Sequence, residues 1–363
     1  MKNTFGNSIS VTLFGESHGE AVGAVVDGLP AGLVVDKAFI SHCLDLRKPV
    51  GKISTPRKEK DEFKFLSGVF NGKTTGTPLC IVIPNENTAS GDYSDSYGKA
   101  RPGHADYTAF VKYNGCEDFR GGGHFSGRIT AALVAVGAVC ISALRKKGVL
   151  IGTHIKACAG VEDSQFTDYE ENINELSCKA FAVLNEQKGK EMVEAIEAVA
   201  QEGDSVGGVL ETAVVGLPVG IGEPWFDSVE SVLSHALFSI PAVKGVQFGA
   251  GFACADKKGS EMNDSFYFEN GKVSTKTNNN GGINGGITNG MPVVFSCAVK
   301  PTPSIAKQQE TIDFLNNENT VLSVKGRHDP CIVHRARIVV DSVTAICLCD
   351  LLSQKFGTDW LGV

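Results

Sequence analysis

The sequence predicts an α+β fold made of two halves, in which apolar helices pack together inside and a sheet covers each face. Three observations lead to this prediction. Short motifs recur in the same order in the two halves of the chain, each half ends in a long apolar helix, and apolar strand-like runs precede each of these helices. A helix that is apolar on every side must be buried, and a sheet must pack its apolar face against another layer.

Composition excludes several classes of protein. The 363 residues carry a formal net charge of -7, and 42% of them are hydrophobic. That balance is typical of a globular protein, and it argues against a general binder of nucleic acid or anionic membranes, which would need a basic surface. The most apolar window, residues 129–144, is shorter than the roughly 20 residues needed to cross a bilayer, so we expect a buried helix there.

The eleven cysteines indicate a reducing compartment. Their number is odd, none has CxxC spacing, and most lie in apolar runs such as the one around Cys140. This usage is typical of reduced thiols packed in the core of a cytosolic protein. The N-terminus lacks a basic region followed by a sustained apolar stretch, so we expect no secretory signal and a cytoplasmic location.

The first half reads as strands followed by helices. Residues 9–14 and 21–26 have the pattern of strands and end in the Gly/Pro turn of residues 27–32. Asp36 can cap a following helix that runs up to Pro49. Residues 63–70 and 78–83 read as strands, and the continuous apolar run of the second predicts burial on both faces. Residues 128–145 form the long apolar helix.

Two segments differ from this pattern. Residues 84–103 are rich in Asn, Asp, Ser, Tyr and Gly, and a loop of this length is uncommon unless it is functional. Residues 161–202 are acidic and helical in composition, with an amphipathic helix over 191–201. We interpret them as a peripheral excursion.

Motifs of the first half recur in the second. Residues 216–220 match 28–32, residues 234–237 match 41–44, and residues 289–292 match 75–78. The helices at 128–145 and 335–352 end the two halves, which we place at about 1–150 and 205–363. Because Gly-Pro turns are common and the matches short, chance similarity is the alternative to duplication.

Three polar turns carry the residues with most chemistry. His18 lies in a glycine-flanked turn, His104 lies between Arg101 and Asp106, and Asp329 follows His328. Each turn also has a structural explanation. His18 would be a histidine in a bend, His104 a histidine hydrogen-bonded to Asp106, and Asp329 a cap at a helix start. Since all three turns adjoin apolar elements, we predict that they form a single pocket.

Glycine-rich and proline-rich segments could hold anions or a flat ring. Residues 121–123 are three glycines that precede the first long helix, which makes them a generic anion site without a Walker motif. Residues 300–304 place a lysine and two hydroxyls after a strand, where a phosphate could bind. Residues 278–286 are rich in glycine, so their backbone could approach a flat ring. The structural alternatives are a stiff edge loop for residues 300–304 and a flexible linker for residues 278–286.

These motifs together resemble the chorismate synthase family. The resemblance rests on residues 15–19, 27–32, 101–107, 203–207, 242–245 and 326–330, which follow the family order over almost the whole chain. It implies a single domain with a β-α-β sandwich, two antiparallel sheets around central helices, and a homotetramer. It also implies a 1,4-anti elimination of phosphate from 5-enolpyruvylshikimate 3-phosphate that requires reduced FMN without net redox change.

The resemblance assigns roles to the three turns. By this resemblance His18 protonates the departing phosphate, His104 protonates or stabilises the reduced flavin, and Asp329 helps to move the ring proton through the flavin N5. A histidine suits the first role because its ordinary pKa, near 6.5, lies close to working pH. The expected substrate-binding residues are Arg47, Lys48, Ser126, Arg128 and Arg327, with Lys52 and Arg57 as weaker candidates.

The resemblance also implies the cofactor residues. The expected FMN-binding residues are His104, His124, Phe125, Ser126, Pro241, Ala242, Gly285, Lys300, Pro301, Thr302, Pro303, Ser304 and Arg327. Arg47 and Lys52 are possible NADP-binding residues. No GxGxxG follows a strand, but members of the family that reduce their own flavin also lack it, so this property stays open.

The sequence departs from the family pattern at several of these positions. His124 and Phe125 stand where the family commonly has Arg and Ser, Pro241 stands where Asn is frequent, and Leu46, Val50 and Asp341 also differ. We expect weaker or differently held flavin rather than lost activity. One alternative is a flavin- or phosphate-binding homologue with impaired catalysis. The other is a metal-dependent phosphohydrolase using His18, His104, Asp106 and Asp329, although no HExxH-like spacing supports it and we expect no metal.

Overall fold

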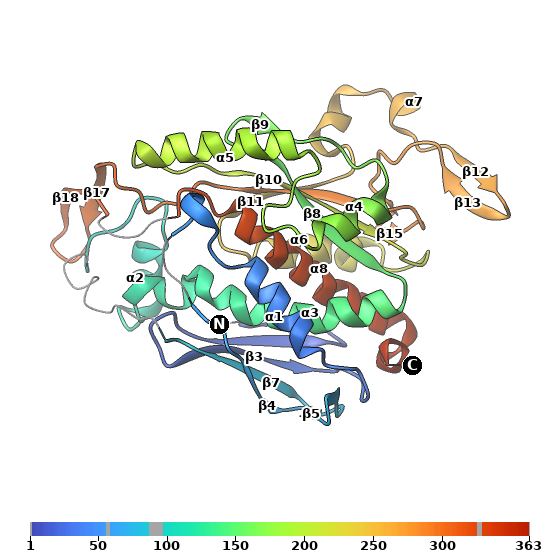
Figure 1. Ribbon diagram of the computed structural model, residues 1–363, viewed down its shortest axis with the longest axis horizontal. Coiled ribbons are helices and arrows are strands. Elements are labelled where there is room, and N and C mark those ends of the chain that lie inside the picture. The colour runs from blue at the N-terminus through green and yellow to red at the C-terminus, as the bar shows by residue number, and fades with distance from the viewer. Residues whose placement is uncertain (1, 56–58, 87–96, 325–328, 363) are drawn as a thin grey trace.

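Two five-stranded sheets form the outer layers of the molecule (Figure 1). The computed structural model describes residues 2–55, 59–86, 97–324 and 329–362. The first sheet has the order β1-β2-β3-β7-β4, and all its pairings are antiparallel. Its strands are β1 (Thr4–Phe5), β2 (Ser10–Gly15), β3 (Ala21–Asp27), β7 (Leu79–Pro84) and β4 (Lys64–Ser67).

The second sheet is also antiparallel and repeats this order. It runs β11-β16-β10-β8-β9, so β8, β10, β16 and β11 correspond in chain order and in position to β2, β3, β7 and β4. Its strands are β11 (Val243–Phe248), β16 (Val293–Val299), β10 (Gly208–Val215), β8 (Leu150–Cys158) and β9 (Val161–Glu162). The predicted α+β class is confirmed.

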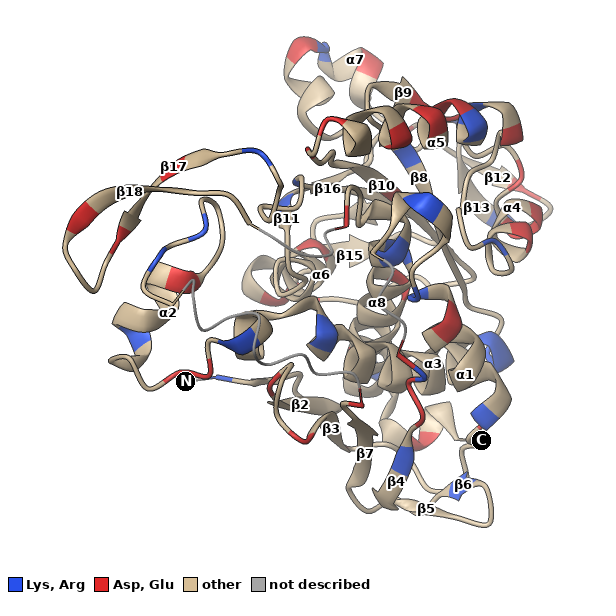
Figure 2. Cartoon of the chain, turned by 60° about the vertical axis from the view of Figure 1, so that its left-hand side comes forward, with Lys and Arg blue, Asp and Glu red and all other residues tan. Residues whose placement is uncertain are grey.

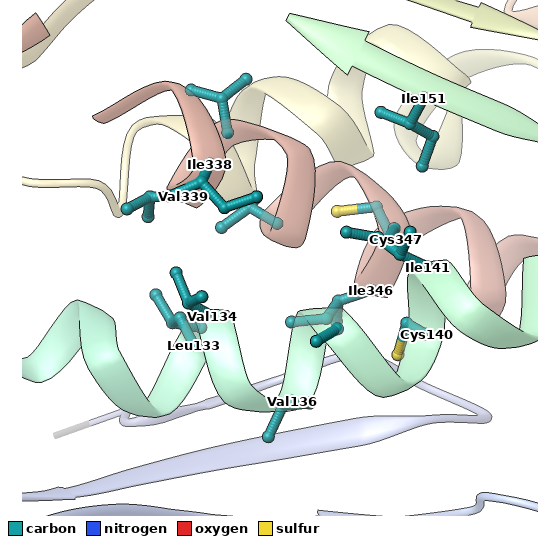
Figure 3. Close-up of a cluster of buried hydrophobic side chains, with 14 of the residues drawn as sticks. Leu133, Val134, Val136, Cys140, Ile141, Ile151, Ile338, Val339, Ile346 and Cys347 are labelled. Carbon is teal, nitrogen blue, oxygen red and sulfur yellow. The ribbon is translucent and has the colours of Figure 1, made fainter. Parts of the chain in front are cut away.

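Two long helices, α3 (Thr130–Lys146) and α8 (Val333–Phe356), lie between the sheets (Figure 1). They contact each other, and α3 packs on β3 and β7 while α8 packs on β8 and β10. Figure 3 shows side chains of both helices, such as Val134 and Ile338, in the shared core. The backbones come close at Gly137, where an added Cβ would stand 2.2 Å from Ser342 Cβ. Such contact requires glycine at this crossing.

The burial of α3 confirms the prediction of a core helix. Residues 127–146 are long and apolar enough to cross a membrane, yet 89% of their most apolar window is buried inside the fold. Fourteen of the 17 residues of α3 are buried. Seven of the eleven cysteines are also buried, and all eleven are free thiols.

Matching turns support duplication of the two halves. The Thr74 hydroxyl donates to Pro30 O at 2.6 Å and accepts from Leu33 N at 2.9 Å. In the second half the Thr288 hydroxyl donates to Pro218 O at 2.7 Å and accepts from Ile221 N at 3.0 Å. Both threonines are buried, so in each turn a buried hydroxyl satisfies one backbone carbonyl and one backbone amide.

Helices at corresponding places follow these turns. α1 (Lys37–Leu46) is capped by Asp36, whose carboxylate accepts from Phe39 N at 3.0 Å, as the sequence predicts. α6 (Val229–Leu237) is capped by Ser228 in the same way. Helix α1 packs on α3, and α6 packs on α8. Each half therefore contributes one long and one short helix to the inner layer.

The predicted excursion lies on the outside of the second sheet. It contains α4 (Tyr169–Leu176) and α5 (Glu186–Gln201), and α5 begins five residues before the predicted amphipathic segment. Figure 2 shows acidic residues along both helices.

Smaller elements complete the fold: β5 (Val69–Phe70), β6 (Lys73–Thr74), α2 (Asp106–Tyr113), α7 (Gly259–Met262), β12 (Phe266–Glu269), β13 (Lys272–Thr275), β14 (Ile283–Asn284), β15 (Ile287–Thr288), β17 (Gln309–Asp313) and β18 (Glu318–Leu322). The described residues also include six 3-10 segments: η1 (Gly51–Ile53), η3 (Arg120–Phe125), η4 (Gly127–Ile129), η5 (Trp225–Asp227), η6 (Gly251–Asp256) and η7 (Thr358–Leu361).

Two strand predictions were wrong in detail. Residues 63–70 do not form one strand, because Gly68 adopts a φ of +80° and separates β4 from β5, which pairs with β6 instead. β7 is not buried on both faces, since its residues alternate between buried and half-buried. Its buried face packs on α3, and its other face lies on the outside of the sheet. Part of the polar loop at 84–103 lies outside the described residues.

Candidate active site

The three glycines at 121–123 place His18 at the site. An added Cβ on Gly121 would stand 2.2 Å from His18 Cε1 and 2.3 Å from its Nδ1, so the imidazole lies directly on this backbone. Ser17 Oγ donates to the carbonyls of Arg120 and Gly121 at 3.1 Å and lies 3.1 Å from His18 Nδ1. All three glycines have positive φ, which side-chain-bearing residues rarely adopt.

The next glycine contacts the second histidine. An added Cβ on Gly122 would stand 3.3 Å from His104 Cε1 and 3.4 Å from its Nε2. His104 Nδ1 lies 2.7 Å from Asp106 Oδ1, and Arg101 donates to both oxygens of the same carboxylate. Burial opposes ionisation of Asp106, but the hydrogen bonds from Arg101 and His104 outweigh it and lower the pKa of Asp106 well below its usual range. Consecutive glycines thus lie against both predicted catalytic histidines.

The segment 300–304 joins the His104 turn to Asp329. Lys300 Nζ donates to Gly103 O, and Thr302 Oγ1 donates to Asp329 O at 2.8 Å. Lys300 N also donates to Ala242 O at 2.9 Å, which brings the predicted flavin residue Ala242 to this segment. Ala242 has a φ of +75°, an uncommon conformation for a residue other than glycine. Four separate parts of the chain meet here.

Asp329 is held by an arginine and a backbone amide. Its Oδ1 accepts from Thr55 N at 2.8 Å, and its Oδ2 accepts from Arg335 Nη1 at 2.7 Å. The alternative that Asp329 caps a helix is wrong, because α8 begins at Val333 after Ile332 and has no side-chain cap. The carboxylate instead bridges the loop after α1 and the first turn of α8.

A single carboxylate binds two of the predicted substrate-binding arginines. Asp61 Oδ2 accepts from Arg47 Nη2 at 3.0 Å, and Asp61 Oδ1 forms an ion pair with Arg128 Nη1. Burial alone would raise the pKa of Asp61, but the two guanidinium groups outweigh it and lower that pKa. Burial lowers the pKa of Arg47 to about 10. Arg47 Nε is buried and has no hydrogen-bond partner among the described residues, which leave this donor unused.

The other predicted substrate-binding residues lie nearby or on the surface. Lys48 Nζ donates to Asp45 Oδ1 at 2.6 Å and to Lys60 O at 3.0 Å. Ser126 Oγ accepts from Arg128 N at 3.3 Å and so caps η4. Lys52 is exposed in η1. Arg57 and Arg327 lie outside the described residues.

The residues that depart from the family pattern have clear environments. His124 Nδ1 lies 2.7 Å from Gly15 O, which ties η3 to the end of β2. Phe125 is 38% exposed and packs edge-on against Tyr113. The three glycines do not open directly onto α3 as expected, because Ser126 and η4 separate them from it. Their amides therefore do not extend the N-terminus of α3.

Two predicted flavin residues have other surroundings. Gly285 lies in the turn between β14 and β15, before the start of β16, whereas Lys300 follows its end. A strand of seven residues spans roughly 20 Å, and the neighbouring Gly286 lies against Glu223 and Ser228, so Gly285 lies toward the opposite end of β16 from segment 300–304. Pro241 is exposed and precedes Ala242. The structure brings together Ala242, Lys300, Thr302 and His104, but not Gly285.

The proposed metal ligands do not form a cluster. Among the described residues, no group of three or more His, Cys, Asp and Glu side chains could hold a metal ion. Asp106 is paired with Arg101, and Asp329 is paired with Arg335. The carboxylates of Asp106 and Asp329 therefore each bind an arginine side chain of this protein.

Sequence reasoning missed several residues that position the site. Asp61, Asn85 and Arg335 carry ionic or polar bonds to predicted site residues. Arg335 lies six residues after Asp329, close enough to suggest a partner, but Asp61 lies in a charged stretch that is typical of a solvated surface. Asn85 lies in the polar loop of residues 84–103, but the composition of that loop did not single it out.

Comparison with known proteins decides the family. The profile described as chorismate synthase matches residues 9–352, nearly the whole chain. The chain belongs to the chorismate synthase family. Chorismate synthase of Dehalococcoides mccartyi strain BAV1 is 46% identical over 97% of this chain and 96% of its own length. Chorismate synthase of Korarchaeum cryptofilum is 45% identical over 97% of each chain.

A solved structure agrees with these relatives. A crystal structure of chorismate synthase superposes with a TM-score of 0.76 at 30% identity, covering 97% of this chain and 94% of that chain. The similarity therefore extends over both sheets and the helices between them. Membership of the chorismate synthase family makes the chain a lyase of aromatic biosynthesis.

Proposed function

We propose that the chain converts 5-enolpyruvylshikimate 3-phosphate to chorismate and phosphate by a 1,4-anti elimination. One observation carries the proposal: Gly121 and Gly122, adjacent in the chain, lie against His18 and His104. The loop 300–304 then connects the His104 turn to Asp329. The substrate must lose a phosphate on one face and a ring proton on the other, which requires an acid and a base at one site.

His18 holds the proton that the leaving phosphate receives. Ser17 Oγ donates to two backbone carbonyls, so it accepts from His18 Nδ1–H in the tautomer that we assign from this network. His18 Nε2 is then the atom that gains and loses a proton. A protonated imidazole stabilises charge that develops on a departing phosphate oxygen.

His104 and Asp329 are held in fixed orientations. Asp106 Oδ1 accepts from His104 Nδ1–H, which leaves His104 Nε2 for the group bound over Gly122. Asp329 receives hydrogen bonds from Thr55 N and Arg335, and these fix the plane of its carboxylate. Positions fixed in this way reduce the reorganisation needed during reaction. In this assignment His104 protonates or stabilises the cofactor, and Asp329 helps to move the proton that leaves the ring.

Cationic side chains bind the three anionic groups of the substrate. One phosphate and two carboxylates must leave water, which is unfavourable unless several charged donors replace it. Arg47, Arg128 and Lys48 supply such donors, and no described residue pairs with the buried Nε of Arg47. Arg327 is the further cation expected from the family pattern.

The residues of this site fit reduced FMN. Lys300 supplies a cation beside the His104 turn, and the hydroxyl of Thr302 follows it toward Asp329, a donor set that suits the phosphate of FMN. Lys300, Thr302 and Ser304, with Ala242 and Ser126, would hold the cofactor. When bound, reduced FMN supplies electron density to the substrate that it recovers after phosphate has left. His124, Phe125 and Pro241 weaken that binding relative to the usual family residues.

Anaerobic turnover with chemically reduced FMN tests this function. Formation of chorismate and phosphate in equal amounts is the expected result. A homologue that has lost catalysis would bind reduced FMN without forming chorismate, and a metal-dependent phosphohydrolase would release phosphate without chorismate and lose activity with a chelator. The same assay with NADPH and oxidised FMN shows whether the chain reduces its own flavin, in which case Arg47 and Lys52 would bind NADPH.

The chain acts as one domain of residues 1–363 with a duplicated β-α-β sandwich, assembled as a homotetramer in the cytoplasm. The matched turns at Thr74 and Thr288 support the duplication of the halves at about 1–150 and 205–363. Trp225, Phe226 and Phe252 are each more than 80% exposed, which is unusual for aromatic residues of a monomer. Sedimentation analysis tests the tetramer, and a monomeric species would contradict it.

A further inference from the structure

Asp61 lies at the centre of a hydrogen-bonded chain that connects the His18 turn with Asp329. Asn85 Nδ2 donates to Glu16 O and Gly19 O, both at 2.9 Å, and these residues flank His18 in its turn. Asn85 Oδ1 accepts from Arg128 Nε at 2.9 Å, and Arg128 forms an ion pair with Asp61. One side of the chain thus runs from the turn of His18 to Asp61.

The other side runs from Asp61 to Asp329. Asp61 Oδ2 accepts from Arg47 Nη2 at 3.0 Å, and Arg47 O accepts from Arg335 Nε at 2.9 Å. Arg335 Nη1 then donates to Asp329 Oδ2 at 2.7 Å. The chain crosses from α1 to the first turn of α8, so it joins the two halves of the molecule at the site.

The charges of this network leave one surplus cation. Three guanidinium groups, those of Arg47, Arg128 and Arg335, face two carboxylates, those of Asp61 and Asp329. The side chains of Asp61 and Arg128 are 1% and 5% exposed, so water screens these charges weakly. Without Asp61, two buried arginines would repel each other and lose their common partner.

The backbone conformation at Asp61 suits an aspartate. Asp61 has a φ of +55°, in the left-handed region that Gly, Asn and Asp adopt more readily than other residues. Its two ion pairs hold the carboxylate in place on this turn.

We propose that Asp61 is a positioning residue of this reaction: by binding Arg47 and Arg128 together, it fixes the substrate-binding arginines and aligns the His18 turn with Asp329. Asp61 itself contacts no reacting atom, because both of its oxygens are occupied by arginines. The proposal rests on the proposed function, since it requires an anionic substrate at these arginines. Asp61 keeps their donors turned in one direction, and it limits the surplus charge that would otherwise retain the released phosphate.

The test compares Asp61→Asn with Asp350→Asn. Asp350 is an equally buried carboxylate that accepts from the amides of Asn7, Ser8 and Ile9 and has no arginine partner in the part of the chain that the structure describes. Asp61→Asn should lower kcat about a hundredfold, the loss expected from a misplacement of about 1 Å, while KM for the substrate does not rise. Because the site gains a positive charge, KM should also become more sensitive to salt than in the wild type. Asp350→Asn should lower Tm and leave kcat and KM unchanged.

A second variant keeps the test valid if Asp61→Asn does not fold. Asn85→Ala removes the bonds from Arg128 to the His18 turn at a half-buried position, and it should lower kcat about tenfold without raising KM. In the double variant with Arg128→Gln, the effects should not add, because both residues act in one network. Unchanged kcat in folded Asp61→Asn or in Asn85→Ala overturns the proposal while wild-type turnover stands. Absence of turnover in the wild type would instead overturn the proposed function.

Discussion

The imidazole of His18 lies directly on the backbone of Gly121, where an added Cβ would stand 2.2 Å from His18 Cε1. Gly121 also has a φ of +59°, so a side chain there is unfavourable for the backbone as well as for the contact. His104 has the same relationship to Gly122 at a longer distance of 3.3 Å. The glycine run therefore determines where both histidines can lie.

Gly121→Ala should displace His18 and lower kcat at least a hundredfold, the effect expected when a catalytic group moves by about 1 Å. Gly127→Ala is the matched control, since its added Cβ would meet no atom within 4 Å and its φ is not positive. Steady-state kinetics with reduced FMN measure both variants. Equal activity of the two alanine variants would contradict the placement of His18.

The double variant His124→Arg with Phe125→Ser should bind reduced FMN more tightly than the wild type. It restores a cation and a hydroxyl that are usual in the family, and a charge-assisted hydrogen bond to the cofactor is expected to strengthen binding about tenfold. In the wild type His124 Nδ1 lies 2.7 Å from Gly15 O, so the gain in flavin affinity must exceed the loss of that contact. Anaerobic flavin titration gives the dissociation constant. An unchanged or larger constant would show that these positions do not set flavin affinity.

Thr74→Val and Thr288→Val should destabilise the protein by similar amounts. Each change keeps the side-chain shape but leaves a buried carbonyl and a buried amide without their partner, which costs about 2 kcal/mol. The effects should add, because the two turns lie in different halves. Urea unfolding of the single and double variants measures this, with exposed Thr75→Val as control. A large effect at only one threonine would contradict equivalent roles.

The stability of the second sheet should depend on pH through His154. This residue is fully buried between Asp163, at 2.8 Å, and Glu211, at 3.2 Å, with Lys156 bound to Glu211. Burial opposes the protonated form, but the two carboxylates outweigh it and raise the pKa of His154. Because the folded pKa is the higher one, this stabilisation is complete below about pH 6.5 and is lost as pH rises through the folded value.

Urea unfolding at several pH values between about 6 and 9 measures this effect. The free energy of unfolding should fall with rising pH in the wild type, and His154→Gln should be less stable and lose most of that slope. The same slope in both proteins would assign the pH dependence to other groups. On the acid side, Asp163 and Glu211 have lowered pKa values, so their contribution is lost only as pH falls through those values.

Much of the fold could be predicted because its signals are local. The apolar composition of α3 and α8 requires burial, and the Gly-Pro turns before Leu33 and Ile221 repeat in sequence as they do in structure. The break at Gly68 could not be predicted, since it depends on the pairing of β5 with β6. Local patterns specify elements, whereas pairing depends on distant segments.

The sequence named several residues that the structure brings together, but it did not show the bonds that connect them. His18, His104 and segment 300–304 meet because of contacts across more than 100 residues, and the polar turns already suggested one pocket. Asp61 could not be found in this way, because its role depends on Arg47 and Arg128, which come from different elements. A charged stretch in sequence gives no sign of which carboxylate is buried.

The most direct test of the central claim is a comparison of turnover and flavin binding in His18→Ala. Because the proposed function assigns to His18 the proton for the leaving phosphate, anaerobic turnover with reduced FMN should fall by two to four orders of magnitude, the range typical of a lost general acid. The dissociation constant of reduced FMN should stay close to the wild-type value. Equal losses of turnover and of flavin binding would contradict the assignment of His18 as the acid.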